Sequence, residues 1–459
     1  MQKRGFQASI DTAFVLSIHA SLKQFCSERF TGRTPTMKFV FSMTLALALL
    51  ATAPALAQDK IDVMTQNQYL GADLTPIITA PNPAAFNDAL ISALQQIAAN
   101  DYPARSKQLA GLIADRLPEL VGLQEMFAFT CLDTPTPGDG CAEPSFSNAF
   151  NDHLDLTLTE LAELDETYVD VAIIENLNIT LPVFLDNDEF PDILVTVLDR
   201  DVVLARADVQ AAPVPFSAIC GQGPLPGVPG ANGSPGCNYE NIAEVDTSLG
   251  VPVKVQRGFV GVDAIVGGKV YRFVNTHLEV KNLVPAPLGT PPGVIPGGSI
   301  QAAQATELNV LVATSLASLP NPLGAVTPII VGDINSGPTD EVFVDPLFPI
   351  PNAPLSPPYM QLANGVDLLG QGPWGLGPLT DAWDLRPGAV PGYSCCQADN
   401  LSNHQSELDH RIDVIFSKEM PSKVKKARVL GAKVSDKTSP PGQGLWPSDH
   451  GSVAAELEF

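Results

Sequence analysis

The chain has 459 residues, of which 45% are hydrophobic and 17% charged, and its formal net charge is −24. A chain of this length and apolar content can bury a substantial core, which excludes an intrinsically disordered protein. Its acidity disfavours non-specific capture of long DNA, because an acidic surface repels a polyanion.

The N-terminal part is predicted to be a leader. A basic start, an apolar run (Phe39–Leu50) and a small-residue ending (Ala55–Ala57) give residues 37–57 the layout of a secretory signal peptide. The run is too short to span a bilayer. Residues 1–36 show no periodic pattern and are interpreted as an unstructured extension or a misplaced translation start. The sequence therefore predicts a secreted or periplasmic protein whose mature chain, residues 58–459, is one domain with loop insertions and no transmembrane segment.

Charge and cysteine content fit export. Residues 1–57 hold six of the 26 Lys and Arg and two of the 50 Asp and Glu, so the remainder carries a formal net charge of −28. Six cysteines remain after Cys26 is lost with the leader, and an even number suggests disulfides. Cys131 with Cys141, and Cys220 with Cys237, each close a short loop and are the natural pairs. The adjacent Cys395-Cys396 could be free, bonded to each other, or paired differently.

Short apolar runs rich in β-branched residues predict strands. In chain order they are Ile61–Thr65, Leu120–Gln124, Val169–Ile174, Val202–Ala205, Gly258–Ile265, Val270–Asn275, Pro328–Val331, Ile412–Phe416 and Gly451–Leu457. Helical spacing predicts helices at Phe86–Asn100, Pro103–Leu117, Ala149–Leu164 and Ile300–Leu316. The Pro/Gly-rich segments 131–147, 212–250, 281–298 and 345–378 are expected to be surface loops. This irregular alternation favours packed sheets flanked by helices over a barrel of repeated βα units.

Polar side chains end or interrupt several of these strands. They are Asn67, Glu125, His277, Asp333, Asn335, Asp449 and His450, with Arg411 and Asp413 at the start of another strand. Each alone has an ordinary explanation as a turn or surface residue. Together they supply oxygen ligands for a hard cation, donors for phosphoryl oxygens and an imidazole next to carboxylates.

The order of these motifs, N…QE…NTHLE…GDINS…RID…SDH, resembles that of the endonuclease/exonuclease/phosphatase superfamily over Ile61–Glu458. The resemblance implies an α/β fold, a four-layer αββα sandwich of two mainly antiparallel sheets with helices outside. It also implies hydrolysis of a phosphoric ester, a phosphodiester or a phosphomonoester, by in-line attack of water. Mg²⁺ is the expected cofactor, with Mn²⁺ or Ca²⁺ as alternatives.

Carried over residue by residue, the resemblance makes Glu125 the main metal ligand, with Asn67 and Asp449 beside it. His277 and Asn335 would bind the phosphate.

The resemblance makes His450 the general base, or in another mechanism the group that protonates the phosphate. Asp333 would position or deprotonate the water, or stabilise the leaving group. Asp381 is the first candidate to fix the imidazole, and Asp409 and Asp449 compete with it. The residues expected to brace the site are Arg411, Asp413 and Asp409.

The substrate stays open between a sphingomyelinase- or phospholipase C-like ester, a nucleotide and a nucleic acid. The charge disfavours a stable nucleic-acid complex. A binding protein that keeps the fold without activity is the alternative of another class, and the complete set of catalytic groups argues against it. A monomer is expected.

Overall fold

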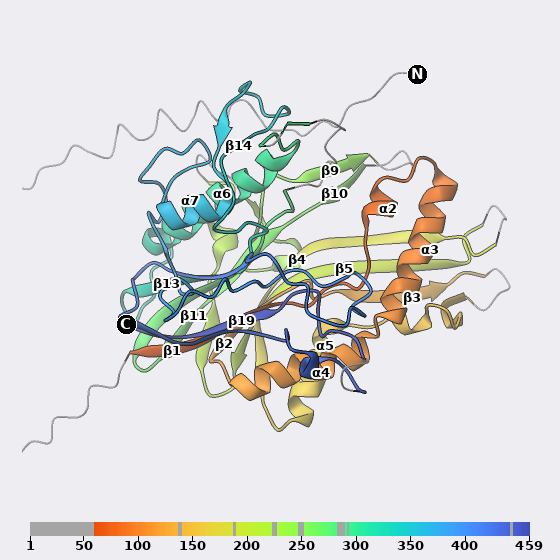
Figure 1. The fold of residues 1–459 in the computed structure, drawn as a ribbon, viewed down its shortest axis with the longest axis horizontal. Helices are drawn as coiled ribbons and strands as arrows, with labels where there is room; N and C mark the ends of the chain where they lie inside the picture. Colours follow the sequence, from red (N-terminus) through yellow and green to blue (C-terminus); the bar gives the residue numbers. More distant parts are fainter. Residues whose placement is uncertain are drawn as a thin grey trace, which may run out of the picture.

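The computed structural model describes residues 59–459 except 136–139, 187–189, 223–226, 247–251, 282–289, 292 and 441–443. The predicted leader and extension, residues 1–57, lie outside the described residues. Two sheets lie face to face at the centre of the molecule, with helices on either side (Figure 1). Among the described residues, no helix is long and apolar enough to cross a membrane.

The first sheet has β1 at its centre. Its strands, in spatial order, are β18 (Lys423–Leu430), β19 (Ser452–Glu458), β1 (Lys60–Asn67), β2 (Leu120–Gln124), β5 (Ile193–Arg206) and β3 (Ala128–Asp133), and β4 (Tyr168–Val183) also pairs with β5. The pair β1 and β2 is parallel and the other pairs are antiparallel.

The second sheet has β13 and β12 at its centre. Its order is β16 (Thr380–Asp381), β17 (Asp413–Ser417), β13 (Val326–Asp333), β12 (Lys269–His277), β11 (Gly258–Val266), β8 (Cys237–Asn238) and β7 (Val228–Pro229), and β6 (Gln210–Pro213) also pairs with β11. Again one pair, β12 with β13, is parallel. Two small hairpins lie apart: β9 (Ala243–Asp246) with β10 (Pro252–Val255), and β14 (Phe343–Val344) with β15 (Pro354–Leu355).

Helices cover the outer face of each sheet. They are α2 (Thr75–Ile78), α3 (Pro83–Ala99), α4 (Tyr102–Arg116), α5 (His153–Glu163), α6 (Gly298–Ser318) and α7 (Pro358–Asn364), with short 3₁₀ turns at Gly140–Ala142, Ser147–Ala149, Phe216–Ala218, Ala231–Gly233 and Val434–Asp436. One apolar cluster, which includes Val63, Val203 and Phe273, lies between the sheets. Separate clusters pack α4 and α5 on the first sheet, and α6 and α7 on the second. The predicted four-layer sandwich is confirmed.

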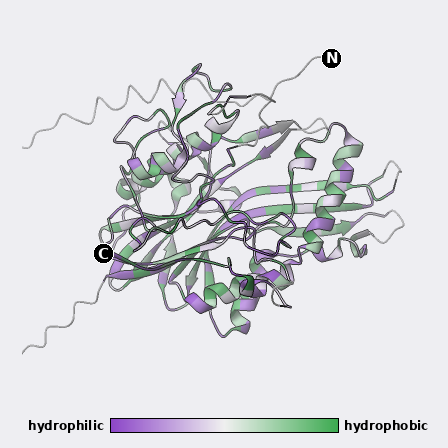
Figure 2. Ribbon diagram, in the orientation of Figure 1, coloured by the Kyte–Doolittle hydropathy of each residue, from purple (hydrophilic) through white to green (hydrophobic). Residues whose placement is uncertain are grey.

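Hydrophobic residues recur along the strands of both sheets, and the helices carry both hydrophobic and hydrophilic residues (Figure 2). All nine predicted strands and all four predicted helices are present. The sequence missed α2, β3, β18 and the outer halves of β4 and β5. In β18, lysines pair with Glu458 and Glu456 of the neighbouring strand, so this edge strand lacks the apolar run that marks the others. Within the expected loops, the structure forms α7 and several two- to four-residue strands.

A buried amide joins the two sheets close to the site described below. Asn275 on β12 donates from Nδ2 to the carbonyl oxygens of Leu123 and Val202 on the first sheet, at 2.8 and 3.0 Å. Its Oδ1 accepts from Gln124 Nε2 at 2.5 Å. A side chain at Gly122 would place its Cβ 2.6 Å from Asn275 Oδ1, so this close approach requires glycine.

The two expected disulfides, Cys131–Cys141 and Cys220–Cys237, are formed. Of the alternatives left open for the adjacent pair, the structure has Cys395 bonded to Cys396.

Candidate active site

The central strands of both sheets carry polar side chains to one edge of the sandwich. Asn67 ends β1, His277 ends β12 and Asp333 ends β13, and Glu125 directly follows β2. Because β1 with β2 and β12 with β13 are parallel pairs, their carboxyl ends meet at this edge. At Gly332, φ is 142° and a Cβ would lie 1.9 Å from the carbonyl oxygen of Thr276. Glycine therefore lets β13 approach β12 just before Asp333.

Asn67 joins the two halves of the site. Its Nδ2 donates to Glu125 Oε1 at 3.2 Å and to Asp333 Oδ2 at 3.1 Å, and its Oδ1 accepts from the backbone N of Tyr69. Glu125 Oε2 accepts from the backbone N of Leu70 at 2.8 Å. The amide nitrogen of Asn67 thus faces the carboxylates and fixes Glu125 and Asp333 relative to each other.

His450 lies between carboxylates and is buried. Its Nδ1 donates to Asp413 Oδ2 at 2.8 Å, and its Nε2 lies 3.7 Å from Asp333 Oδ2. Burial lowers the pKa of His450, but the charges of Asp413, Asp449 and Asp333 outweigh burial and raise the pKa well above its usual value. The bond to Asp413 fixes the tautomer that leaves Nε2 facing Asp333.

The carboxylate that orients this ring is Asp413, not Asp381 or Asp409. Asp381 instead accepts from the Tyr359 hydroxyl at 2.8 Å and lies 3.4 Å from Arg411 Nη1. Asp409 is exposed and bonds the neighbouring His410. The expectation for Asp381 and Asp409 is corrected: neither contacts His450, while Asp413, expected only to brace the site, holds the ring.

The second histidine, His277, is held by an arginine. His277 Nδ1 accepts from Arg257 Nη1 at 3.1 Å, which leaves the proton on Nε2. That Nε2 lies 3.6 Å from Asp333 Oδ2 and 3.3 Å from Asn335 Nδ2. Burial, then Arg257 and His450, hold the pKa of His277 well below its usual value. A neutral imidazole can still donate a hydrogen bond to a phosphoryl oxygen.

Asn335 is held by its neighbours. Its Nδ2 donates to the carbonyl oxygen of Leu278 at 2.9 Å, and its backbone N donates to Asp333 Oδ1 at 2.9 Å. The second amide hydrogen remains for a ligand. Burial raises the pKa of Asp333 to about 7, and the charge of Asp413 adds to this shift.

Glu125 and Asp449 are two carboxylates close enough to influence each other's charge. Burial, and then the charge of Glu125, raise the pKa of Asp449 to about 6, so these two groups repel each other without a cation. Carboxylate oxygens are hard ligands of the kind that Mg²⁺ takes, whereas Asn67 presents its amide nitrogen to the carboxylates and its Oδ1 to the backbone N of Tyr69.

Two other groups of three possible ligands occur among the described residues. One is Asp333, Asp413 and His450, where Asp413 Oδ2 accepts from His450 Nδ1 at 2.8 Å and His450 Nε2 lies 3.7 Å from Asp333 Oδ2. The other adds His450 to Cys395 and Cys396, whose sulfurs are joined to each other.

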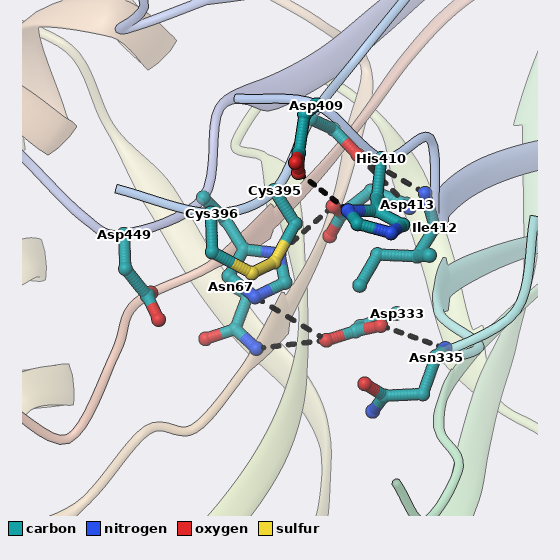
Figure 3. The surroundings of a disulfide bond; sticks show 12 residues. Asn67, Asp333, Asn335, Cys395, Cys396, Asp409, His410, Ile412, Asp413 and Asp449 are labelled. Carbon is teal, nitrogen blue, oxygen red and sulfur yellow. Dashed lines mark hydrogen bonds and ion pairs between the residues drawn. A yellow bond between two sulfur atoms is a disulfide. The ribbon is translucent and has the colours of Figure 1, made fainter. Parts of the chain in front are cut away.

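A cavity of about 820 Å³ opens beside the site. Asn335 and the Cys395–Cys396 disulfide line its inner end, and Lys281, Trp383 and His410 line the rest. The disulfide lies next to Asn67, Asp333 and Asp413 (Figure 3). Cys395 is buried and Cys396 is exposed, so the disulfide forms part of the cavity wall.

The structure brings together the expected Asn67, Glu125, His277, Asp333, Asn335, Asp449 and His450. Arg411 pairs with Asp381 and Asp384 at the cavity wall. Sequence reasoning missed Arg257 as a partner of His277. Arg257 precedes β11, and only the antiparallel pairing of Gly258 with His277 brings it to the ring. No motif in the sequence marks it.

No protein-family model and no curated protein matches the sequence. Solved structures that are similar include TDP2 from Caenorhabditis elegans, with 13% identity, coverage of 89% of this chain and 77% of that chain, and a TM-score of 0.36. A mannosyl-6-phosphatase from Bacteroides thetaiotaomicron VPI-5482 has 16% identity, coverage of 87% and 100%, and a TM-score of 0.40. An endonuclease/exonuclease/phosphatase from Beutenbergia cavernae DSM 12333 has 18% identity, coverage of 87% and 72%, and a TM-score of 0.35.

Proposed function

We propose that the protein is an exported, divalent-metal-dependent phosphoesterase of the endonuclease/exonuclease/phosphatase type. The observation that carries this proposal is the bond between His450 Nδ1 and Asp413, which aims Nε2 toward Asp333 at the edge where Glu125, Asn67 and His277 converge. A carboxylate-oriented imidazole beside a group of oxygen ligands is suited to activating water for attack on phosphorus.

Each side chain has a proposed role in this reaction. His277 Nε2 and Asn335 Nδ2 donate to the phosphoryl oxygens and hold phosphorus in line with the attacking water. His450 Nε2 takes a proton from that water, and Asp413 stabilises the imidazolium that forms. Asp333, held by Asn67, orients the water or the leaving oxygen.

Glu125 and Asp449 would hold the metal ion, with Asn67 adjoining; Mg²⁺ is proposed, with Mn²⁺ or Ca²⁺ as alternatives. When bound, a divalent cation would supply positive charge that stabilises the phosphoryl and leaving oxygens. The same charge would partly cancel the negative charge of Asp449 near His450. With that charge present, His450 would lie closer to the neutral form that a base requires.

The decisive experiment combines metal removal with a variant. After chelation, the purified mature chain should lose hydrolysis of bis-nitrophenyl phosphate, and added Mg²⁺ or Mn²⁺ should restore it. His450→Ala should reduce kcat by a factor on the order of 10²–10⁴, the usual contribution of a general base. His404→Ala is the matched control, because this histidine is exposed and lies outside the site.

The alternative of an inactive binding protein predicts the reverse result. Such a protein would show no metal-restored turnover on any ester in a panel of DNA, sphingomyelin, inositol phosphate and bis-nitrophenyl phosphate. An equal rate for wild type and His450→Ala would reject the proposed role of His450 even if the metal restores activity.

A further inference from the structure

A second, apolar cavity borders Arg257, the residue that contacts His277. It has a volume of about 170 Å³ and lies between helices α2 and α3 and the outer halves of β4 and β5. Its lining is mainly aliphatic and aromatic and includes Leu70, Ile77, Leu94, Phe127, Leu177 and Val197. Asp199 and Arg257 are its charged lining residues.

Two residues in the cavity wall, Arg257 and Leu70, connect the cavity to the candidate active site. Arg257, in its wall, donates to His277 Nδ1 at 3.1 Å. Leu70, also in its wall, donates its backbone N–H to Glu125 Oε2 at 2.8 Å. The cavity therefore begins one residue away from both the proposed phosphate donor and the proposed metal ligand.

The apolar part reaches the surface. Leu74 is 38% exposed, and Leu70 and Ile77 are half-buried, although all three are large aliphatic residues. An apolar recess that opens beside a charged centre fits a ligand with a hydrocarbon part and an ionic part.

The two cavities share no lining residue. The larger one meets the site at Asn335 and has Lys281, Arg386 and His410 in its wall, while the smaller one meets the site at Arg257 and is apolar. A phosphate held between His277 and Asn335 would therefore lie near a large cavity that has charged residues in its wall and near a smaller, apolar cavity.

We propose that the apolar cavity binds an alkyl or acyl chain of the substrate, so that the preferred substrate is an amphiphilic phosphoester with a polar group on the other side of phosphorus. This inference rests on the proposed function and names its substrate class. The net acidity of the chain agrees with it, because an alkyl phosphoester carries few charges whereas a polynucleotide carries many.

The test uses nitrophenyl alkyl phosphodiesters that differ only in the alkyl chain, methyl against octyl, at concentrations where both are monomeric. Full burial is worth roughly fourfold per methylene, and with partial burial we expect kcat/KM for the octyl ester to exceed that for the methyl ester by about tenfold or more. Val197→Trp fills the cavity and should bring the octyl-to-methyl ratio close to one. Thr196→Trp is the matched control: Thr196 is the adjacent residue of β5, pairs with Thr180 and does not line the cavity, so the ratio should stay high.

A binding measurement keeps the inference testable if Val197→Trp does not fold. Calorimetry on the wild-type chain should show dodecyl phosphate binding at least about tenfold more tightly than ethyl phosphate. Equal affinities, or equal kcat/KM for the two esters, would overturn the chain-binding cavity while leaving phosphoester hydrolysis in place. Absence of turnover on every ester, with tight dodecyl phosphate binding, would instead reject the proposed function alone.

A separate experiment distinguishes a bilayer lipid from a free alkyl phosphoester as the source of the alkyl or acyl chain. Release of phosphocholine from phosphatidylcholine vesicles, at a rate that falls in Val197→Trp, would assign the chain to a bilayer lipid. Chain-length preference on monomeric esters without vesicle hydrolysis would assign it to a free alkyl phosphoester.

Discussion

At the scale of single residues, the site depends on which carboxylate holds the His450 ring. Four aspartates, Asp381, Asp409, Asp413 and Asp449, are near it in sequence or in motif order, and only Asp413 bonds Nδ1. The register of the second sheet decides this, because β13 pairs with β17 so that Asp333 lies opposite Asp413. A pairing between segments 80 residues apart leaves no local trace, so the sequence predicted the participants and not this partnership.

Asp413→Asn tests the revised partnership. An amide can donate to Nδ1, which would move the imidazole proton to Nε2 and remove its capacity to accept a proton from water. We expect kcat to fall by about 10²-fold or more with little change in KM, measured on a phosphodiester at saturating metal.

Asp381→Asn is the control for this prediction. Asp381 bonds Tyr359 and Arg411 and does not reach His450. Its variant should therefore keep most of kcat when it is measured at a temperature at which both proteins are fully folded. A larger loss of kcat in Asp381→Asn than in Asp413→Asn would restore Asp381 as the orienting residue.

At the scale of elements, helix α6 is buried on nearly all sides. The residues from Gly298 to Asn309 are all buried, because α7 and the segment around β14 and β15 cover the face that a surface helix would expose. The spacing of apolar residues predicted this helix. Its burial was not predicted, because the segment that covers it was expected to be a surface loop. Glu307 is consequently enclosed, and it accepts hydrogen bonds from the backbone N atoms of Glu240 and Asn241.

Glu307 is expected to make stability fall as pH rises. Burial raises its pKa to about 7 from 4.5, so the folded chain keeps a proton that the unfolded chain has lost. Its contribution is fully present below the unfolded pKa and is lost as pH rises through about 7, by up to about 3 kcal/mol. Urea unfolding at pH 5 and pH 8 should show a smaller decline for Glu307→Gln than for wild type.

The exposed Glu163 provides the comparison. Glu163→Gln should keep the wild-type decline between the two pH values. An identical decline in Glu307→Gln would mean that the Glu307 carboxyl does not hold its proton in the folded chain.

At the scale of the whole molecule, the apolar runs predicted the strands, while their assembly into two facing sheets came from the family resemblance. The runs do not encode which strand neighbours which: β19, the last strand, lies beside β1, the first. The cysteine spacing was more informative, because the chain between two paired cysteines limits how far apart they can lie.

Removal of the Cys220–Cys237 disulfide should destabilise the entire domain. Both cysteines are buried in the cluster that packs α6 on the second sheet, and 17 positions separate them. Cys220→Ala with Cys237→Ala should lower the free energy of unfolding by about 2–4 kcal/mol, measured by urea denaturation.

The Cys131–Cys141 pair closes a shorter loop at the end of β3 and serves as the comparison. Its double alanine variant should lose less stability. An unchanged free energy of unfolding in Cys220→Ala/Cys237→Ala would show that packing alone holds this part of the second sheet.

The amide of Asn275 has a consequence for how this scaffold tolerates change. It ties one sheet to main-chain oxygens of the other, at a point where Gly122 leaves no room for a side chain. These contacts fix the position of one sheet relative to the other. The polar side chains at the ends of the strands are therefore held at the same edge of the sandwich. Insertions can lengthen the peripheral segments without disturbing that alignment, whereas any substitution at position 122 would shift the candidate-site residues of one sheet relative to those of the other.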